Sequence, residues 1–204
     1  MSQGLYFQLF SIHGLLRHEA MELGRDADTG GQIKYVVELA EALSRHEKVG
    51  RVDLFTRLIV DKRVSDDYSQ PVVTVSDKFR IVRIQCGGKK YMRKELLWPH
   101  LDEYIDRTIK FIKRESGRPD IVHGHYPDAG YVAISLSEYF STPFIYTGHS
   151  LGLPKKQRLL REGVSDEEMQ KKLFIDQRIA VEEEILQNAD LVVTSTRQEV
   201  EDQY

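Results

Sequence analysis

The chain has 204 residues, which suits one large domain or a tightly packed pair of domains. Hydrophobic residues make up 41% of it and charged residues 30%, so it can bury a substantial core. The formal net charge of −3 argues against a nucleic-acid-binding protein, because phosphate backbones select a strong basic excess. We expect no membrane span and no secretion signal. The single cysteine, Cys86, excludes an internal disulfide and favours a reducing, cytoplasmic setting.

Strand and helix patterns alternate along the chain. Apolar runs typical of strands occupy residues 4–12, 51–59, 78–86, 119–125, 142–150 and 190–196. Helical periodicity predicts helices over 30–46, 99–116, 128–140 and 165–189, with another helix starting at 197. We interpret residues 60–77 as a loop or short insertion. This order predicts an α/β domain with a mostly parallel sheet.

Local signals mark where two of these helices begin. In the helix over 30–46, one predicted apolar face comprises Ile33, Val36, Val37, Ala40 and Leu43. We expect Asp28 or Thr29 to cap its first turn. Ser165, followed three residues later by Glu168, matches a capping box at the start of the helix over 165–189.

Polar and glycine-rich stretches follow most of the predicted strands. Examples are "HGHYPDAG" and "GHSLG", which follow the strands over 119–125 and 142–150. Ligands of open parallel sheets bind beyond the carboxyl ends of the strands. We therefore expect these stretches to gather along one edge of the sheet and to form a ligand site there.

Gly30 and Gly31 stand where the helix over 30–46 begins, although glycine weakens a helix by about 1 kcal/mol relative to alanine. The pair could let an anionic or polyhydroxylated ligand approach the helix N-terminus, or it could form a tight turn. Neither the dinucleotide fingerprint nor a phosphate-binding loop of the G-x-x-x-x-G-K-[ST] type is present, which disfavours a nicotinamide dehydrogenase or a simple ATPase.

Four histidines lie where predicted strands end, namely His13, His123, His125 and His149. A zinc site is conceivable, but the spacing does not support one, and we expect no metal. We expect His123 to pack against the sheet, whereas His149, between two glycines in "TGHSLG", is a candidate ligand-binding residue.

Several charged residues have both a structural and a functional interpretation. Asp128 could simply cap the helix over 128–140. Arg178 and Glu182, four residues apart, could form a surface ion pair. The basic run Lys89, Lys90, Arg93 and Lys94 is either a solvated loop or a phosphate clamp at the ligand edge.

Several long motifs, in this order, cover nearly the whole chain: "SIHGLLRHEAMELGRDADTGGQIKYVVELAEAL", "RVDLFTR", "RKELLWPHLDEYID", "PDIVHGHYPDAG", "TGHSLG" and "LVVTSTRQE". Together they resemble the N-terminal half of the sucrose-phosphate synthase family, which are retaining glucosyltransferases of the GT-B type. The resemblance implies a Rossmann-like, three-layer acceptor-binding domain over residues 1–204. Sucrose synthases share "DTGGQ" and a "WP" segment, but "GHYPDAG" and "TGHSLG" match the phosphate synthases better.

The resemblance implies a role for eight residues in binding fructose 6-phosphate and transferring glucose to it. His149 and Asp128 are the expected catalytic residues, with His149 facing the transferred glucose. The expected acceptor-binding residues, among which Lys94 and Arg178 hold the phosphate, are Gly30, Gly31, Gln32, Lys94, Tyr126 and Arg178.

The implied reaction transfers glucose from UDP-glucose with retention, through an oxocarbenium-like transition state, and requires no cofactor or metal. We expect the C-terminal domain that holds UDP-glucose to be absent from this chain, and the isolated chain to bind the acceptor without transferring glucose. Two alternatives stay open: a sucrose-synthase-like glucosyltransferase and a non-catalytic sugar-phosphate-binding module. A dinucleotide-binding domain is a weaker third.

Overall fold

The computed structural model describes residues 4–115 and 117–202. In this part of the chain, seven strands form one sheet in the order β3-β4-β2-β1-β5-β6-β7. All neighbouring strands are parallel except β3 and β4, which are antiparallel. The strands are β1 (Leu5–Phe10), β2 (Val49–Arg57), β3 (Val72–Ser76), β4 (Phe79–Ile84), β5 (Ile121–His125), β6 (Phe144–Thr147) and β7 (Leu191–Val192).

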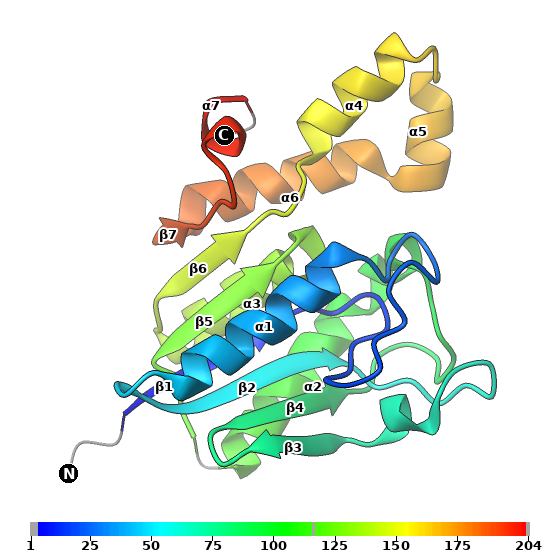
Figure 1. Ribbon diagram of the computed structural model, residues 1–204. Helices are drawn as coiled ribbons and strands as arrows, with labels where there is room; N and C mark the ends of the chain where they lie inside the picture. The colour runs from blue at the N-terminus through cyan, green and yellow to red at the C-terminus, as the bar shows by residue number, and fades with distance from the viewer. Residues whose placement is uncertain (1–3, 116, 203–204) are drawn as a thin grey trace.

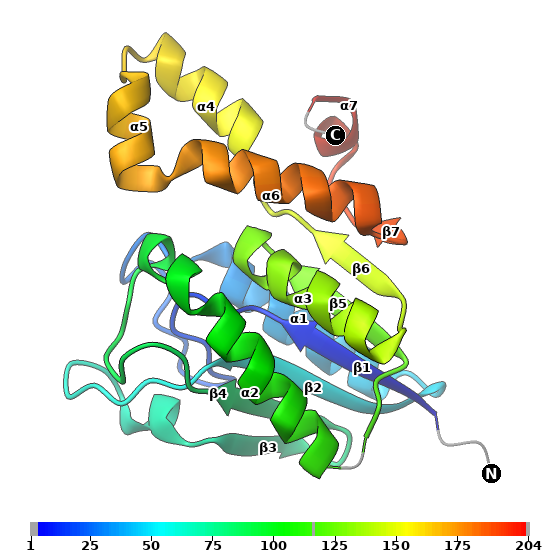
Figure 2. The same ribbon diagram turned by 180° about the vertical axis from the view of Figure 1, so that it is seen from behind.

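Helices cover both faces of the sheet, so the predicted three-layer α/β class is confirmed (Figures 1 and 2). Helix α1 lies on one face, and α2 and α3 lie on the other. Beyond β6, helices α4, α5 and α6 form a separate group at one end of the sheet. The helices are α1 (Gly31–Arg45), α2 (Leu101–Arg114), α3 (Pro127–Phe140), α4 (Gly152–Arg161), α5 (Asp166–Leu173), α6 (Ile175–Asn188) and α7 (Arg197–Asp202).

The alternation of side chains along each strand builds two cores. Leu9 and Leu54 belong to a cluster that includes the buried face of α1, whereas Phe10 and Phe55 belong to the cluster under α2 and α3. The predicted apolar face of α1 is confirmed, since four of its five residues are buried and Leu43 packs against them. This double burial keeps the sheet rigid and fixes its carboxyl edge.

Three expectations about secondary structure were wrong. The segment over 60–77 contains β3, an edge strand whose side chains alternate only between exposed and half-buried. Helix α4 was not expected at all. The predicted helix over 165–189 is two helices, α5 and α6, because Phe174 between them adopts a left-handed backbone with φ of 49°. The predicted cap at Ser165 is confirmed, since its Oγ accepts a hydrogen bond from the Glu168 N–H at 3.2 Å.

The expected cap of α1 was also wrong, and the capping interpretation of Asp128 does not hold. Helix α1 has Gly30 at its N-cap and no side-chain cap. Thr29 instead accepts a hydrogen bond from the Leu15 N–H at its Oγ1. At α3 the N-cap is Tyr126, so Asp128 lies inside the first turn. The side chains of Asp28 and Asp128 are therefore available for other partners.

Candidate active site

The carboxyl edge of the sheet brings together segments that are far apart in the sequence. The loop between β1 and α1 and the segments after β4, β5 and β6 all reach this edge, and α4 and α5 extend beside it (Figure 1). A small cavity opens there. Its lining residues are Lys94, Glu95, Trp98, Tyr126, Asp128, Lys155, Leu173, Ile175 and Arg178.

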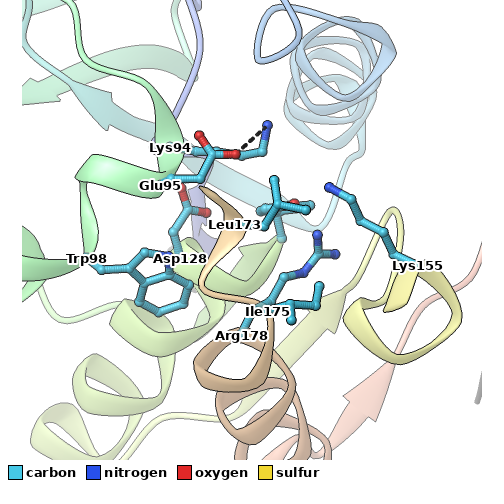
Figure 3. Close-up of a pocket in the computed structure, with 9 residues that line it drawn as sticks. Lys94, Glu95, Trp98, Asp128, Lys155, Leu173, Ile175 and Arg178 are labelled. Carbon is cyan, nitrogen blue, oxygen red and sulfur yellow. Dashed lines mark ion pairs between the residues drawn. The ribbon is translucent and has the colours of Figure 1, made fainter. Parts of the chain in front are cut away.

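Four of the eight predicted site residues line this cavity, namely Lys94, Tyr126, Asp128 and Arg178. Figure 3 shows Lys155 and Arg178 on one side of it, and Glu95, Asp128 and Trp98 on the other. Cationic groups therefore stand opposite carboxylates. Such a cavity suits a ligand that is anionic at one end and carries hydroxyl groups at the other.

Arg178 is anchored by a buried ion pair rather than the expected surface pair. Its Nε donates to Glu182 Oε1 at 2.8 Å, and one terminal nitrogen donates to the Ser150 carbonyl at 2.7 Å. Both side chains are about 95% buried. Burial raises the pKa of Glu182, and Arg178 only partly offsets this effect. The guanidinium also lies over the Tyr126 ring, 4.5 Å from its centroid. These contacts hold Arg178 in one orientation at the cavity wall.

Lys155 is the functional candidate that sequence reasoning missed. It lies on α4, and that helix was not predicted. The residue is half-buried, and the described residues give its side chain no hydrogen bond or ion pair. Burial lowers the pKa of Lys155, the nearby charges of Arg178 and Lys94 lower it further, and the Glu95 carboxylate offsets only part of this effect. A cation held close to other cations without a direct ion-pair partner is well suited to bind an anion.

Lys94, by contrast, already has carboxylate partners. Its Nζ forms an ion pair with Asp28 and lies 3.7 Å from Glu95 Oε1 (Figure 3). Its backbone N–H also donates to Asp28 Oδ2 at 2.9 Å. Burial alone would raise the pKa of Asp28, but the hydrogen bonds from Lys94 outweigh it and lower that pKa. Asp28 thus fixes Lys94 at the cavity instead of capping α1.

Asp128 uses both of its carboxylate oxygens within the protein. Oδ2 lies 2.8 Å from His13 Nδ1, and Oδ1 accepts a hydrogen bond from the Ala129 N–H at 2.7 Å. Both Asp128 and His13 are buried. The edge of the His13 ring contacts Tyr126, whose backbone has an unusual φ of 78°. Strained backbone of this kind persists where surrounding structure enforces it, often at functional sites.

The other four predicted residues lie at the same edge of the sheet but do not line the cavity. Gln32 donates to Ser11 Oγ at 3.3 Å and to the His125 carbonyl at 3.4 Å, which ties the start of α1 to the ends of β1 and β5. His149, with a left-handed φ of 58°, has its Nε2 3.1 Å from His125 Nδ1. His123 is buried and bonds to Thr147 Oγ1 at 2.9 Å, in agreement with its expected packing against the sheet.

Gly30 and Gly31 have no structural need to be glycine. Neither residue has a positive φ, and a Cβ atom added to either would meet nothing within 4 Å. Gly30 has φ of −121° and ψ of −155°, an extended conformation that any residue adopts. The tight-turn interpretation therefore does not explain the pair. Open space beside a helix N-terminus is what a ligand approaching the backbone needs.

No group of three or more His, Cys, Asp or Glu side chains in residues 4–115 and 117–202 is arranged to hold a metal ion. No helix in the same ranges is long and apolar enough to cross a membrane.

Comparisons with known proteins agree on one family. The model of the glycosyl transferase 4-like domain matches residues 30–203. Sucrose-phosphate synthase 4 of Arabidopsis thaliana is 45% identical over all of this chain, which spans 21% of that protein. The Zea mays sucrose-phosphate synthase is 45% identical over 98% of the chain, again 21% of its own length.

A solved structure shows the same similarity in three dimensions. The sucrose-phosphate synthase of Thermosynechococcus elongatus superposes with a TM-score of 0.76 and 30% identity. The match covers 97% of this chain and 44% of that chain. The chain therefore belongs to the glycosyl transferase 4-like domain family.

Proposed function

We propose that this chain is the acceptor-binding part of a sucrose-phosphate-synthase-like glucosyltransferase and that it binds fructose 6-phosphate. The observation that carries the proposal is the bipolar cavity at the carboxyl edge, with Lys155 and Arg178 facing Glu95 and Asp128. Sequence similarity to sucrose-phosphate synthases over the whole chain supports this choice of acceptor.

The phosphate end of the acceptor belongs with the cations. Arg178 is pre-oriented by Glu182 and Ser150, and Lys155 has no direct ion-pair partner among the described residues. A phosphate between them would relieve the mutual repulsion that lowers the pKa of Lys155 after burial. Lys94, close enough to affect Lys155, completes the cationic set, but its two carboxylate neighbours weaken its contribution.

The sugar end then faces the carboxylates and the start of α1. Tyr126, Asp128, Gln32 and the backbone of Gly30 and Gly31 are our candidates for contacts with the fructose hydroxyls. We assign Asp128 a catalytic role through its negative charge, which stabilises an oxocarbenium-like transition state from a fixed position. His149 faces the transferred glucose in this arrangement, so that both substrates are held in reacting geometry.

Glucose comes from UDP-glucose in this proposal and is transferred with retention to give sucrose 6-phosphate. We place the UDP-glucose site in a domain outside these 204 residues, because the chain covers only 44% of its structural relative. The single buried cysteine is consistent with a cytoplasmic setting.

Calorimetric titration with fructose 6-phosphate and with fructose tests the acceptor assignment. Lys155→Ala removes a cation without breaking an ion pair, so we expect fructose 6-phosphate affinity to fall roughly 10- to 150-fold, the worth of a charge-assisted hydrogen bond of about 1.5–3 kcal/mol. Fructose affinity should stay unchanged. Lys156→Ala is the matched control, since Lys156 pairs with Asp166 and Asp176 and does not line the cavity.

Equal losses for both ligands in Lys155→Ala would contradict the phosphate assignment. Wild-type protein that binds fructose as tightly as fructose 6-phosphate would favour a sucrose-synthase-like acceptor. Binding without sucrose 6-phosphate formation, after addition of the C-terminal domain of a sucrose-phosphate synthase and UDP-glucose, would support a non-catalytic sugar-phosphate-binding module.

A further inference from the structure

Three histidine rings form a continuous row at the carboxyl ends of β5 and β6. His123 and His125 lie two residues apart on the same side of β5, with ring centroids 4.0 Å apart. The His149 ring follows, 5.3 Å from the His125 centroid, and its Nε2 lies 3.1 Å from His125 Nδ1. His125 is fully buried, whereas His149 is half-buried beside Tyr35. His125 is therefore a buried hydrogen-bond partner of His149, whose ring is partly exposed.

All three rings are neutral near pH 7. Burial lowers the pKa of His123 to about 3 and that of His149 to about 4. Burial and the neighbouring histidines lower the pKa of His125 well below its usual value. Each ring therefore carries one proton, on either Nδ1 or Nε2. The hydrogen bond between His125 Nδ1 and His149 Nε2 requires that one and only one of these two nitrogens carry a proton.

The surroundings of His125 decide whether its Nδ1 or the Nε2 of His149 carries this proton. Its Nε2 is buried and has no hydrogen-bond partner among the described residues. A buried N–H without an acceptor is rarer in proteins than a buried acceptor without a donor. The arrangement that avoids a buried, unsatisfied N–H places the His125 proton on Nδ1, where it is donated to His149. His149 must then accept at Nε2 and carry its own proton on Nδ1.

We propose that His125 is a positioning residue that holds His149 in the Nδ1–H tautomer. His149 then offers a neutral hydrogen-bond donor, and not a general base, to an oxygen of the bound ligand. The left-handed backbone of His149 supports this, since an unfavourable conformation is maintained where the ring must keep one position. Only the identity of the ligand oxygen rests on the proposed function; the tautomer itself does not.

Nitrogen-15 spectra of the ring nitrogens test the proposal on the ligand-free chain at pH 7. The chain is labelled at histidine, and a His149→Gln variant assigns the His149 signals by their loss. We expect Nδ1 of His149 to show the shift of a protonated ring nitrogen and Nε2 that of an unprotonated one. The opposite pattern, or two protonated nitrogens, would overturn the proposal. Because no ligand is needed, this failure is distinguishable from failure of fructose 6-phosphate binding.

Substitution of His125 tests whether this residue sets the tautomer of His149. In His125→Phe, we expect the His149 signals to move towards the Nε2–H pattern that histidine favours in water. Thr147→Val is the matched control: it removes the partner of His123 but leaves the contact between His125 and His149, so the His149 signals should not move. Retention of the Nδ1–H pattern in folded His125→Phe would refute the positioning role. If His125→Phe does not fold, the wild-type spectrum still decides the tautomer.

Discussion

The Gly31→Ala variant tests whether glycine is needed at this position for ligand binding or for the stability of the fold. A Cβ atom at this exposed first residue of α1 meets nothing within 4 Å, and the backbone there is helical. Alanine at a compatible position stabilises a protein by about 0.4–1 kcal/mol, because it restricts the unfolded chain. For a protein of this size we therefore expect the melting temperature to rise by roughly 1–4 °C.

The same methyl group occupies the space into which we place the acceptor. Overpacking a fitted contact costs about 1–3 kcal/mol, so we expect fructose 6-phosphate affinity to fall roughly 5- to 150-fold. Differential scanning calorimetry and isothermal titration on the same samples measure the two effects.

Gly124→Ala is the control, because its Cβ would lie 2.9 Å from the Ala129 carbonyl oxygen and should destabilise the fold. A lower melting temperature in Gly31→Ala, or unchanged affinity, would refute the reasoning.

Two further predictions concern buried ionisable groups. Unfolded His123 takes up a proton below its ordinary pKa of 6.5 whereas the folded ring, with a pKa of about 3, stays neutral. Folding stability therefore falls on acidification, by about 1.6 kcal/mol between pH 6.5 and pH 5, because the unfolded His123 is only half protonated at the start of this range. His123→Gln should lose less stability than wild type over this range in urea titrations, and identical pH dependence would contradict the assignment. Glu182→Gln keeps only one of the two acceptor oxygens that serve Arg178 and the Gly152 N–H, and it leaves a buried cation uncompensated. We expect up to about 3–5 kcal/mol of destabilisation, measured by urea unfolding, together with tighter fructose 6-phosphate binding; unchanged stability would show that the pair is not needed.

The alternating strands and helices, and the edge at which the ligand stretches meet, were predictable because parallel sheets impose them. The buried strand β1 is mostly apolar, and the apolar face of α1 repeats at helical spacing. Once the order of elements is known, the carboxyl edge follows from the geometry of crossover connections. This is why residues as distant as Gln32, Asp128 and His149 could be expected at the same edge.

The parts that the sequence did not reveal depend on tertiary contacts. Edge strand β3 buries neither face fully, so its alternation is faint. The break at Phe174 occurs within a continuous helical pattern, and no glycine or proline marks it. Helix α4 packs beside α6 with only Gly152 buried along its own length, which leaves no apolar stripe to detect. Lys155 was missed for this reason, and Asp28 was taken for a cap because its partner Lys94 is 66 residues away.

A crystal structure of the chain with fructose 6-phosphate bound tests the central claim most directly. We predict the phosphate between Lys155 and Arg178, with the sugar directed towards Asp128 and the glycine pair. A sugar phosphate bound away from the carboxyl edge, or bound there with its phosphate directed at Glu95 and Asp128, would contradict the account.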